Sequence, residues 1–181
     1  PQAMENRTIK SLLVVAASGL LLLSGCTTDG GQKSTVQPHP STTAGGQVMS
    51  TDTSLPKVSG QAGTAPTIEA PHGTPPSTLR TQDEIVGSGA EAKPNSTLTV
   101  HYTLMAWSTG KVVESSWSSG NPATFPLAQV IPGWQQGIPG MKVGGRRLLV
   151  IPPALGYGAQ GSGPIGPNET LIFVVDLISV A

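Results

Sequence analysis

The sequence predicts an α+β domain in which an antiparallel sheet packs against one short helix, and two observations support this fold class. The three Trp, two Tyr and two Phe residues all lie between Tyr102 and Phe173, so only this part of the 181-residue chain can build a large core. In the same part, short runs alternate apolar and polar residues, which is typical of strands with one buried face.

Four strands are predicted from this alternation. The run at 97–107, TLTVHYTLMAW, places apolar residues on one face at every second position. A turn at Thr109–Gly110 leads into a second strand at 112–116. A third strand, at 145–151, ends before Pro152 because proline cannot donate a hydrogen bond to a strand ladder.

The last strand, at 170–180, is predicted to be central in the sheet. Its apolar residues are Leu171, Phe173, Val175 and Leu177 on one face, and Ile172, Val174 and Ile178 on the other. Since both faces are apolar, we expect both to be covered.

A short helix is predicted at 131–137, within the stretch QVIPGWQQGIPGMKVGG. Pro132 suits the first helical turn, where its missing N–H matters least, and Gly137 suits the end. Trp134 then projects from this helix. From its position alone, Trp134 fits an ordinary core residue as well as a binding-site residue.

The N-terminal part has a different composition. Arg7 and Lys10 precede a short apolar run that ends at 23–26, Leu-Ser-Gly-Cys, which resembles a bacterial lipobox. We therefore expect a signal peptide at 1–25 and a lipidated Cys26, which would anchor the protein to the cell membrane outside the cytoplasm. The alternative is a signal anchor with an incidental cysteine.

Residues 26–54 are rich in Ser, Thr, Gly, Gln and Pro and predict a flexible tether. The folded domain is then expected at 55–181, with short edge strands between 55 and 78. The formal net charge is zero, so nucleic acid is not an expected partner. The three His residues are widely spaced and lack ligand companions, so no metal site is expected.

Five separated motifs, in the same order, resemble the FKBP-type peptidyl-prolyl cis-trans isomerases. They are VHYT at 100–103, GKVVESSW at 110–117, QVIPGWQQGIPGMKVGGRR at 129–147, IPPALGYG at 151–158 and NETLIFVVDL at 168–177. The resemblance covers roughly 79–181 and is greatest to actinobacterial secreted or lipidated members. It implies a curved, half-barrel sheet of five or six strands around the helix, and catalysis of X–Pro bond rotation.

The resemblance also implies a hydrophobic pocket for a prolyl ring. By residue-to-residue transfer, the catalytic residues are Tyr157, Glu114 and Trp134, with the indole of Trp134 as the floor. The implied substrate-binding residues are Tyr102, Val113, Phe125, Val130, Ile131, Ile165 and Phe173. No cofactor and no metal are implied. The expected ligands are proline-containing polypeptides and macrolide inhibitors, and we expect a monomer.

Three positions depart from the resemblance. Val113 and Ala123 stand where many members have Phe, and Glu114 stands where Asp is usual. These changes leave a second reading open: a weakly catalytic chaperone, or a module that binds peptides or macrolides.

Overall fold

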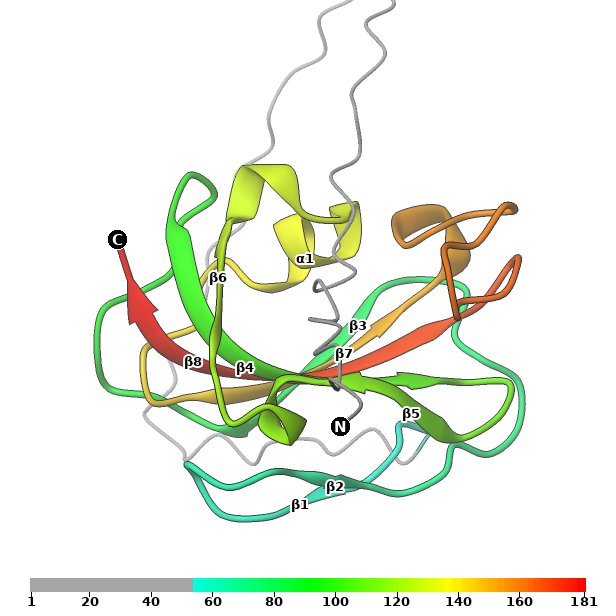
Figure 1. Cartoon of the computed structure of the whole chain (residues 1–181), viewed down its shortest axis with the longest axis horizontal. Coiled ribbons are helices and arrows are strands. Elements are labelled where there is room, and N and C mark those ends of the chain that lie inside the picture. The colour runs from blue at the N-terminus through cyan, green and yellow to red at the C-terminus, as the bar shows by residue number, and fades with distance from the viewer. Residues whose placement is uncertain (1–53) are drawn as a thin grey trace, which may run out of the picture. The chain divides into compact units, whose positions relative to one another are not determined.

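A six-stranded antiparallel sheet forms the body of the computed structural model, which describes residues 54–181 (Figure 1). Its strands are β3 (Arg80–Ile85), β4 (Thr97–Ala106), β5 (Lys111–Ser115), β6 (Ala123–Pro126), β7 (Arg146–Ile151) and β8 (Leu171–Val180). The spatial order is β3-β7-β8-β4-β5, and β6 pairs with the first residues of β4. The strand β8 is therefore central, as the sequence predicts, and β5 and β6 share one edge.

The helix α1 (Pro132–Gly137) lies over one face of this sheet, which we call the inner face (Figure 1). Pro132 is its first residue and Gly137 its last, which confirms the predicted helix to within one residue. Glycine is needed where α1 approaches β7. A Cβ atom on Gly133 would lie 2.5 Å from Cγ2 of Ile151, and one on Gly137 would lie 2.5 Å from Cδ2 of Leu149.

The alternation in β4 and β8 divides their side chains between two cores. Leu98, Val100, Tyr102 and Leu104 of β4, with Leu171, Phe173, Val175 and Leu177 of β8, join the core on the inner face. The opposite, outer face has a second core, formed by Met105, Trp107, Leu148, Val150, Ile172 and Val174 with Leu55 and Ile68. The prediction that both faces of β8 are covered is therefore confirmed for Ile172 and Val174.

The outer face is covered by residues 54–78, which we call the strap. It contains two short strands, β1 (Val58–Ser59) and β2 (Thr67–Ile68), which pair only with each other (Figure 1). Short strands in this segment were predicted, but as edge strands. They form a separate two-stranded sheet because Leu55 and Ile68 pack on the outer core instead of extending the main ladder.

Three further features differ from the sequence prediction. Neither β3 nor β6 was expected, since RTQDEI has no apolar alternation and ATFP ends in proline. Ile178 was expected on a covered face but is 43% exposed. A bulge explains this: Thr99 pairs with Ser179 and Val100 with Leu177, which leaves Ile178 without a partner on β4.

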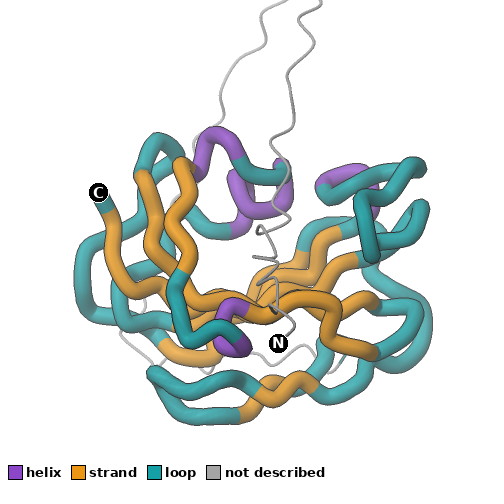
Figure 2. The backbone as a smooth tube through the Cα atoms, viewed as in Figure 1, coloured by secondary structure: helices purple, strands orange, loops and turns teal. Residues whose placement is uncertain are grey.

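Short helical turns connect the strands: η1 (Ser116–Ser118), η2 (Leu127–Gln129) and η3 (Pro153–Leu155). Figure 2 shows the strands in orange, joined by loops in teal and by the short helical segments in purple. The predicted signal peptide, the lipidation of Cys26 and the tether as far as residue 53 lie outside the described residues. Within residues 54–181, no helix has the length and hydropathy required to span a bilayer.

Candidate active site

Four aromatic rings meet on the inner face of the sheet, centred on Trp134. The ring centroids of Tyr102, Phe125 and Phe173 lie 6.0, 6.0 and 5.3 Å from that of the indole, with interplanar angles of 81°, 89° and 87°. Edge-to-face contacts of this kind are the favoured geometry for aromatic pairs. We call these four residues the aromatic cluster. The indole has no exposed surface, and its Nε1 has no hydrogen-bond partner among the described residues.

Four different elements supply the cluster, which explains why their spacing in sequence is irregular. Tyr102 and Phe173 come from neighbouring strands β4 and β8 and face the same side because of the strand alternation. Phe125 comes from β6, on the other side of β4, and Trp134 comes from α1. The indole of the short helix thus packs directly against side chains of the sheet.

Glu114, on β5, holds one ring of the cluster in place. The hydroxyl of Tyr102 donates a hydrogen bond to Oε1 of Glu114 over 2.5 Å. A bond to an ionised carboxylate is shorter and stronger than one between neutral groups. The ring of Tyr102 is therefore fixed at both ends, by its strand and by this carboxylate.

Tyr157 follows η3 and packs, half-buried, against the inner core. Burial raises the pKa of its phenol above the usual 10.0, and the negative charge of Glu114 raises it further. At neutral pH the group is therefore a neutral hydroxyl, able to donate a hydrogen bond to a carbonyl oxygen.

The remaining predicted residues surround the cluster. Val130, Ile131 and Ile165 are buried in the inner core, and Val113 is half-buried against it. The structure thus brings together all ten residues predicted for catalysis and substrate binding on one face of the sheet. Their individual roles remain predictions.

Gln135 contributes a contact that the sequence analysis did not identify. Its Nε2 donates a hydrogen bond to the carbonyl oxygen of Val130 over 2.7 Å, which fixes the segment leading into α1. The sequence signal is weak, since a polar residue on a short helix is ordinarily just solvated. Trp117, which has no role in the sequence analysis, stacks on His101 with 3.9 Å between ring centroids.

The side chains gathered at this site are mostly apolar. Its ionisable groups are a carboxylate engaged with a tyrosine and a phenol that stays protonated. In the described part of the chain, no three His, Cys, Asp or Glu side chains are grouped so as to hold a metal ion. A site built from such side chains suits a rigid apolar ring, with the two polar groups beside it.

Comparisons with known proteins agree with this geometry. The family described as FKBP-type peptidyl-prolyl cis-trans isomerase matches residues 89–178. A probable FK506-binding protein of Corynebacterium glutamicum is 52% identical over 114 residues, which cover 63% of this chain and 97% of that protein. An FK506-binding protein of Streptomyces anulatus is 49% identical over 119 residues, which cover 64% of this chain and 96% of that one.

A solved structure shows the same fold. The crystal structure of FkpA from Escherichia coli matches with a TM-score of 0.54 and 41% sequence identity. The match covers 56% of this chain and 47% of that one, so FkpA has about half its length outside the shared part.

Proposed function

Because the chain belongs to the FKBP-type peptidyl-prolyl cis-trans isomerases, we propose that its isomerase activity serves proteins outside the cytoplasm, at a membrane to which Cys26 anchors it. The chain is an isomerase by family, and the aromatic cluster is the observation that supports a site for a prolyl ring. The lipobox-like sequence at 23–26 supports the location.

The reaction needs no covalent step. Rotation about an X–Pro bond is opposed by amide conjugation, with a barrier of about 18–20 kcal/mol, and takes tens to hundreds of seconds when uncatalysed. In the twisted transition state the C–N bond loses double-bond character and the carbonyl becomes less dipolar. An apolar surface that excludes water disfavours the dipolar planar amide, so it lowers the barrier to twisting.

In this proposal the aromatic cluster receives the proline ring, with Trp134 as the floor. Val113, Val130 and Ile165 line the edges of the site. The hydroxyl of Tyr157 donates to one substrate carbonyl, and the backbone N–H of Ile131 donates to another.

The two donors in this arrangement fix the chain on either side of the bond, so that rotation takes place within a shaped site. Glu114 acts through Tyr102: its carboxylate accepts a hydrogen bond from the Tyr102 hydroxyl and so positions that wall of the site.

A protease-coupled assay on a prolyl peptide tests this assignment. We expect the chain to accelerate isomerisation, and Tyr157→Phe to reduce kcat/KM by about tenfold through the loss of one hydrogen bond to substrate. The matched control is Gln136→Ala, an exposed position on α1, which should retain full activity. A folded chain whose rate equals that of buffer would refute the proposal.

We also propose that FK506-type macrolides compete for this site, because the two actinobacterial relatives carry FK506-binding in their names. A macrolide titration in the same assay measures this directly. Full activity at saturating macrolide would contradict the assignment of the ligand to the aromatic cluster.

The second candidate function is a binding module with little catalysis. It is favoured by Val113 and Ala123, which are smaller than the Phe expected at these positions and border the inner core. The discriminating experiment is aggregation of a proline-free client protein. Suppression of aggregation without prolyl turnover would favour this second function over the first.

The membrane location is tested separately. Mass spectrometry of the protein isolated from its native cells should find Cys26 as a lipidated first residue. In the same cells, Cys26→Ser should release the protein from the membrane fraction, and an unchanged distribution would exclude the anchor.

A further inference from the structure

Two consecutive arginines of β7 reach opposite faces of the sheet. Arg147 pairs across the ladder with Val175, a residue of the inner core, so its side chain lies on the inner face. Arg146 lies on the outer face, where it contacts the strap. Of the two, Arg147 is therefore the one on the same side of the sheet as α1 and the aromatic cluster, and its side chain is 13% exposed.

The guanidinium of Arg147 joins α1 to the edge strand β3. Its Nε and Nη2 donate to the two carboxylate oxygens of Asp83, over 2.5 and 3.0 Å. Its Nη1 donates to the carbonyl oxygen of Gly137, the last residue of α1, over 2.8 Å. Because a bidentate pair fixes the plane of a guanidinium, the carboxylate of Asp83 holds the remaining donor towards the end of the helix.

The helix α1 depends on such contacts for its position. It has only six residues, and a helix of this length is not stable through its own hydrogen bonds. The carbonyl groups of its last turn have no partners further along the helix. The carbonyl oxygen of Trp134 accepts from the N–H of Ile138, whereas that of Gly137 accepts from Arg147. Arg147 thus supplies a tertiary hydrogen bond at the C-terminal end of α1.

We propose that Arg147 is a positioning residue of the isomerase site and acts through α1. The helix carries the indole of Trp134 and directly follows Ile131, whose N–H donates to substrate in the proposed function. Releasing the end of α1 shifts both groups away from the geometry that catalysis needs. This inference rests on the proposed function, because it gives Arg147 a part in that same site. Asp83 contributes only by orienting Arg147.

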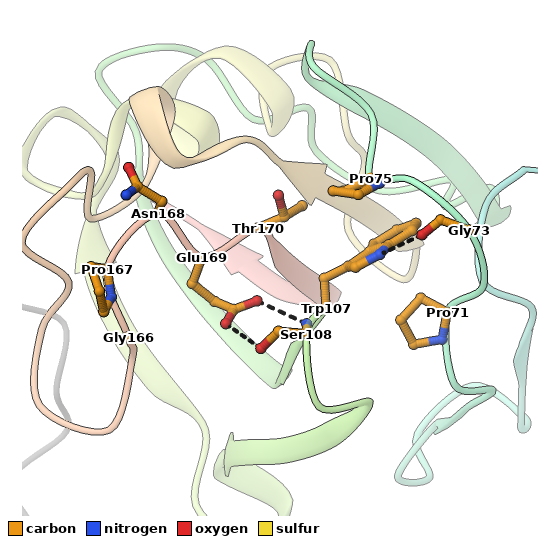
Figure 3. Close-up of a pocket in the computed structure, with 10 residues that line it drawn as sticks. All are labelled: Pro71, Gly73, Pro75, Trp107, Ser108, Gly166, Pro167, Asn168, Glu169 and Thr170. Atoms are coloured by element: carbon orange, nitrogen blue, oxygen red, sulfur yellow. Dashed lines mark hydrogen bonds between the residues drawn. The ribbon is translucent and has the colours of Figure 1, made fainter.

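The loop at 156–170, which carries Tyr157 and Ile165, has an anchor of its own. Figure 3 shows this anchor in the wall of a cavity of about 710 Å³, where the carboxylate of Glu169 accepts hydrogen bonds from both the N–H and the hydroxyl of Ser108. These two bonds tie the end of the loop to the end of β4 and involve neither α1 nor Arg147. A change at Arg147 should therefore alter the position of α1 while this loop stays in place.

The test compares the prolyl-isomerase activity of two full-length variants that differ by one position. Arg147→Met should lower kcat/KM about fivefold, because a displaced group reduces the rate even when the change lies away from the reacting atoms. Arg146→Met removes a still more deeply buried arginine from the outer face and should keep the wild-type kcat/KM. Activities are compared where circular dichroism shows each variant to be folded. If Arg146→Met does not fold, Arg80→Met makes the same change at an exposed position of β3.

Two further measurements separate positioning from a general loss of structure. In the ¹⁵N-labelled full chain, the indole N–H signal of Trp134, assigned by its loss in Trp134→Phe, should shift in Arg147→Met but not in the control variant. The double variant of Arg147→Met with Asp83→Ala should be as active as Arg147→Met alone, since Asp83 acts through the arginine.

The proposal is overturned by any of four results. These are wild-type kcat/KM in folded Arg147→Met, an unmoved Trp134 signal, an equal loss of activity in the control variant, or additive losses in the double variant. A wild-type chain without activity would instead refute the proposed function, and the Trp134 signal would still decide whether Arg147 orients the helix.

Discussion

Arg146 links the sheet to the strap, and its replacement by Met tests how much these contacts stabilise the fold. The side chain is 1% exposed. Its Nε binds Asp176, its Nη1 donates to the carbonyl oxygen of Gly60 over 3.1 Å, and its Nη2 donates to that of Thr64 over 2.6 Å. Met preserves much of the length and apolar volume, so the change mainly removes the charge and the donors.

The size of the expected loss of stability follows from the carboxylate that the substitution leaves unpaired. In Arg146→Met the carboxylate of Asp176 stays buried with no partner, a situation that costs about 3–5 kcal/mol. The neighbouring Arg147 provides the contrast. It donates to the carbonyl oxygen of Gly137 and pairs with Asp83, whose side chain is 34% exposed, so solvent can reach that carboxylate when the pair is lost. We expect Arg147→Met to cost about 1 kcal/mol.

Urea unfolding measures the difference between the free energies of unfolding of the two variants. The pH dependence of that difference tests whether the unpaired carboxylate of Asp176 is its cause. Burial raises the pKa of Asp176 above 3.8, while the hydrogen bond and charge of Arg146 oppose this rise. Without Arg146 the pKa rises further, so the folded state favours the protonated acid more than the unfolded state does. The destabilisation is therefore largest at neutral pH and decreases as the pH falls through the raised pKa towards 3.8.

Two results would refute this reasoning. One is a loss of stability in Arg146→Met no larger than that in Arg147→Met. The other is a loss that stays constant as the pH falls, which would mean that the unpaired carboxylate is not its source. The double variant Arg146→Met with Asp176→Asn should recover part of the stability at neutral pH, since no buried charge remains.

Three further predictions concern the inner face. Gly133→Ala should lower the free energy of unfolding by about 1–3 kcal/mol despite the better helix propensity of Ala, because the new methyl group overlaps Ile151; thermal unfolding measures this, and a stabilised variant would contradict the close packing. The raised pKa of Tyr157 predicts that the loss of kcat/KM at alkaline pH has its midpoint above pH 10.0, and a decline starting near neutral pH would mean that the loss of the Tyr157 proton does not control the rate. Glu114→Gln replaces the charged acceptor of the Tyr102 hydroxyl and should reduce kcat/KM about fivefold, corresponding to about 1 kcal/mol, with wild-type activity as the contrary result.

Local sequence patterns predicted the elements that lie in the middle of the fold. The alternation in β4 and β8 predicted which side chains face α1, because strand geometry leaves a side chain only two directions. Pro132 and Gly137 predicted the limits of α1, since each acts through its own backbone. The motif resemblance then brought the residues of the aromatic cluster together before their distances were known.

Elements formed by distant partners were not predictable in this way. The strand β3 consists mostly of polar residues and owes its place to pairing with β7, over 60 residues further along the chain. Ile178 looks like a core residue in the sequence, and only the bulge opposite Val100 turns it towards solvent. Arg146 and Arg147 are equivalent in the sequence, yet one is buried beneath the strap and the other pairs with β3.

The sequence by itself determined that this chain has a sheet, a short helix and the residues of a prolyl isomerase. The tertiary structure alone decided what covers the outer face, which arginine is buried, and that Arg147 reaches the end of α1. The physical reason is the distance along the chain over which each property is determined. Strand periodicity and helix limits follow from neighbouring residues, whereas the burial of a side chain and the hydrogen bonds of its polar atoms depend on which distant segments meet.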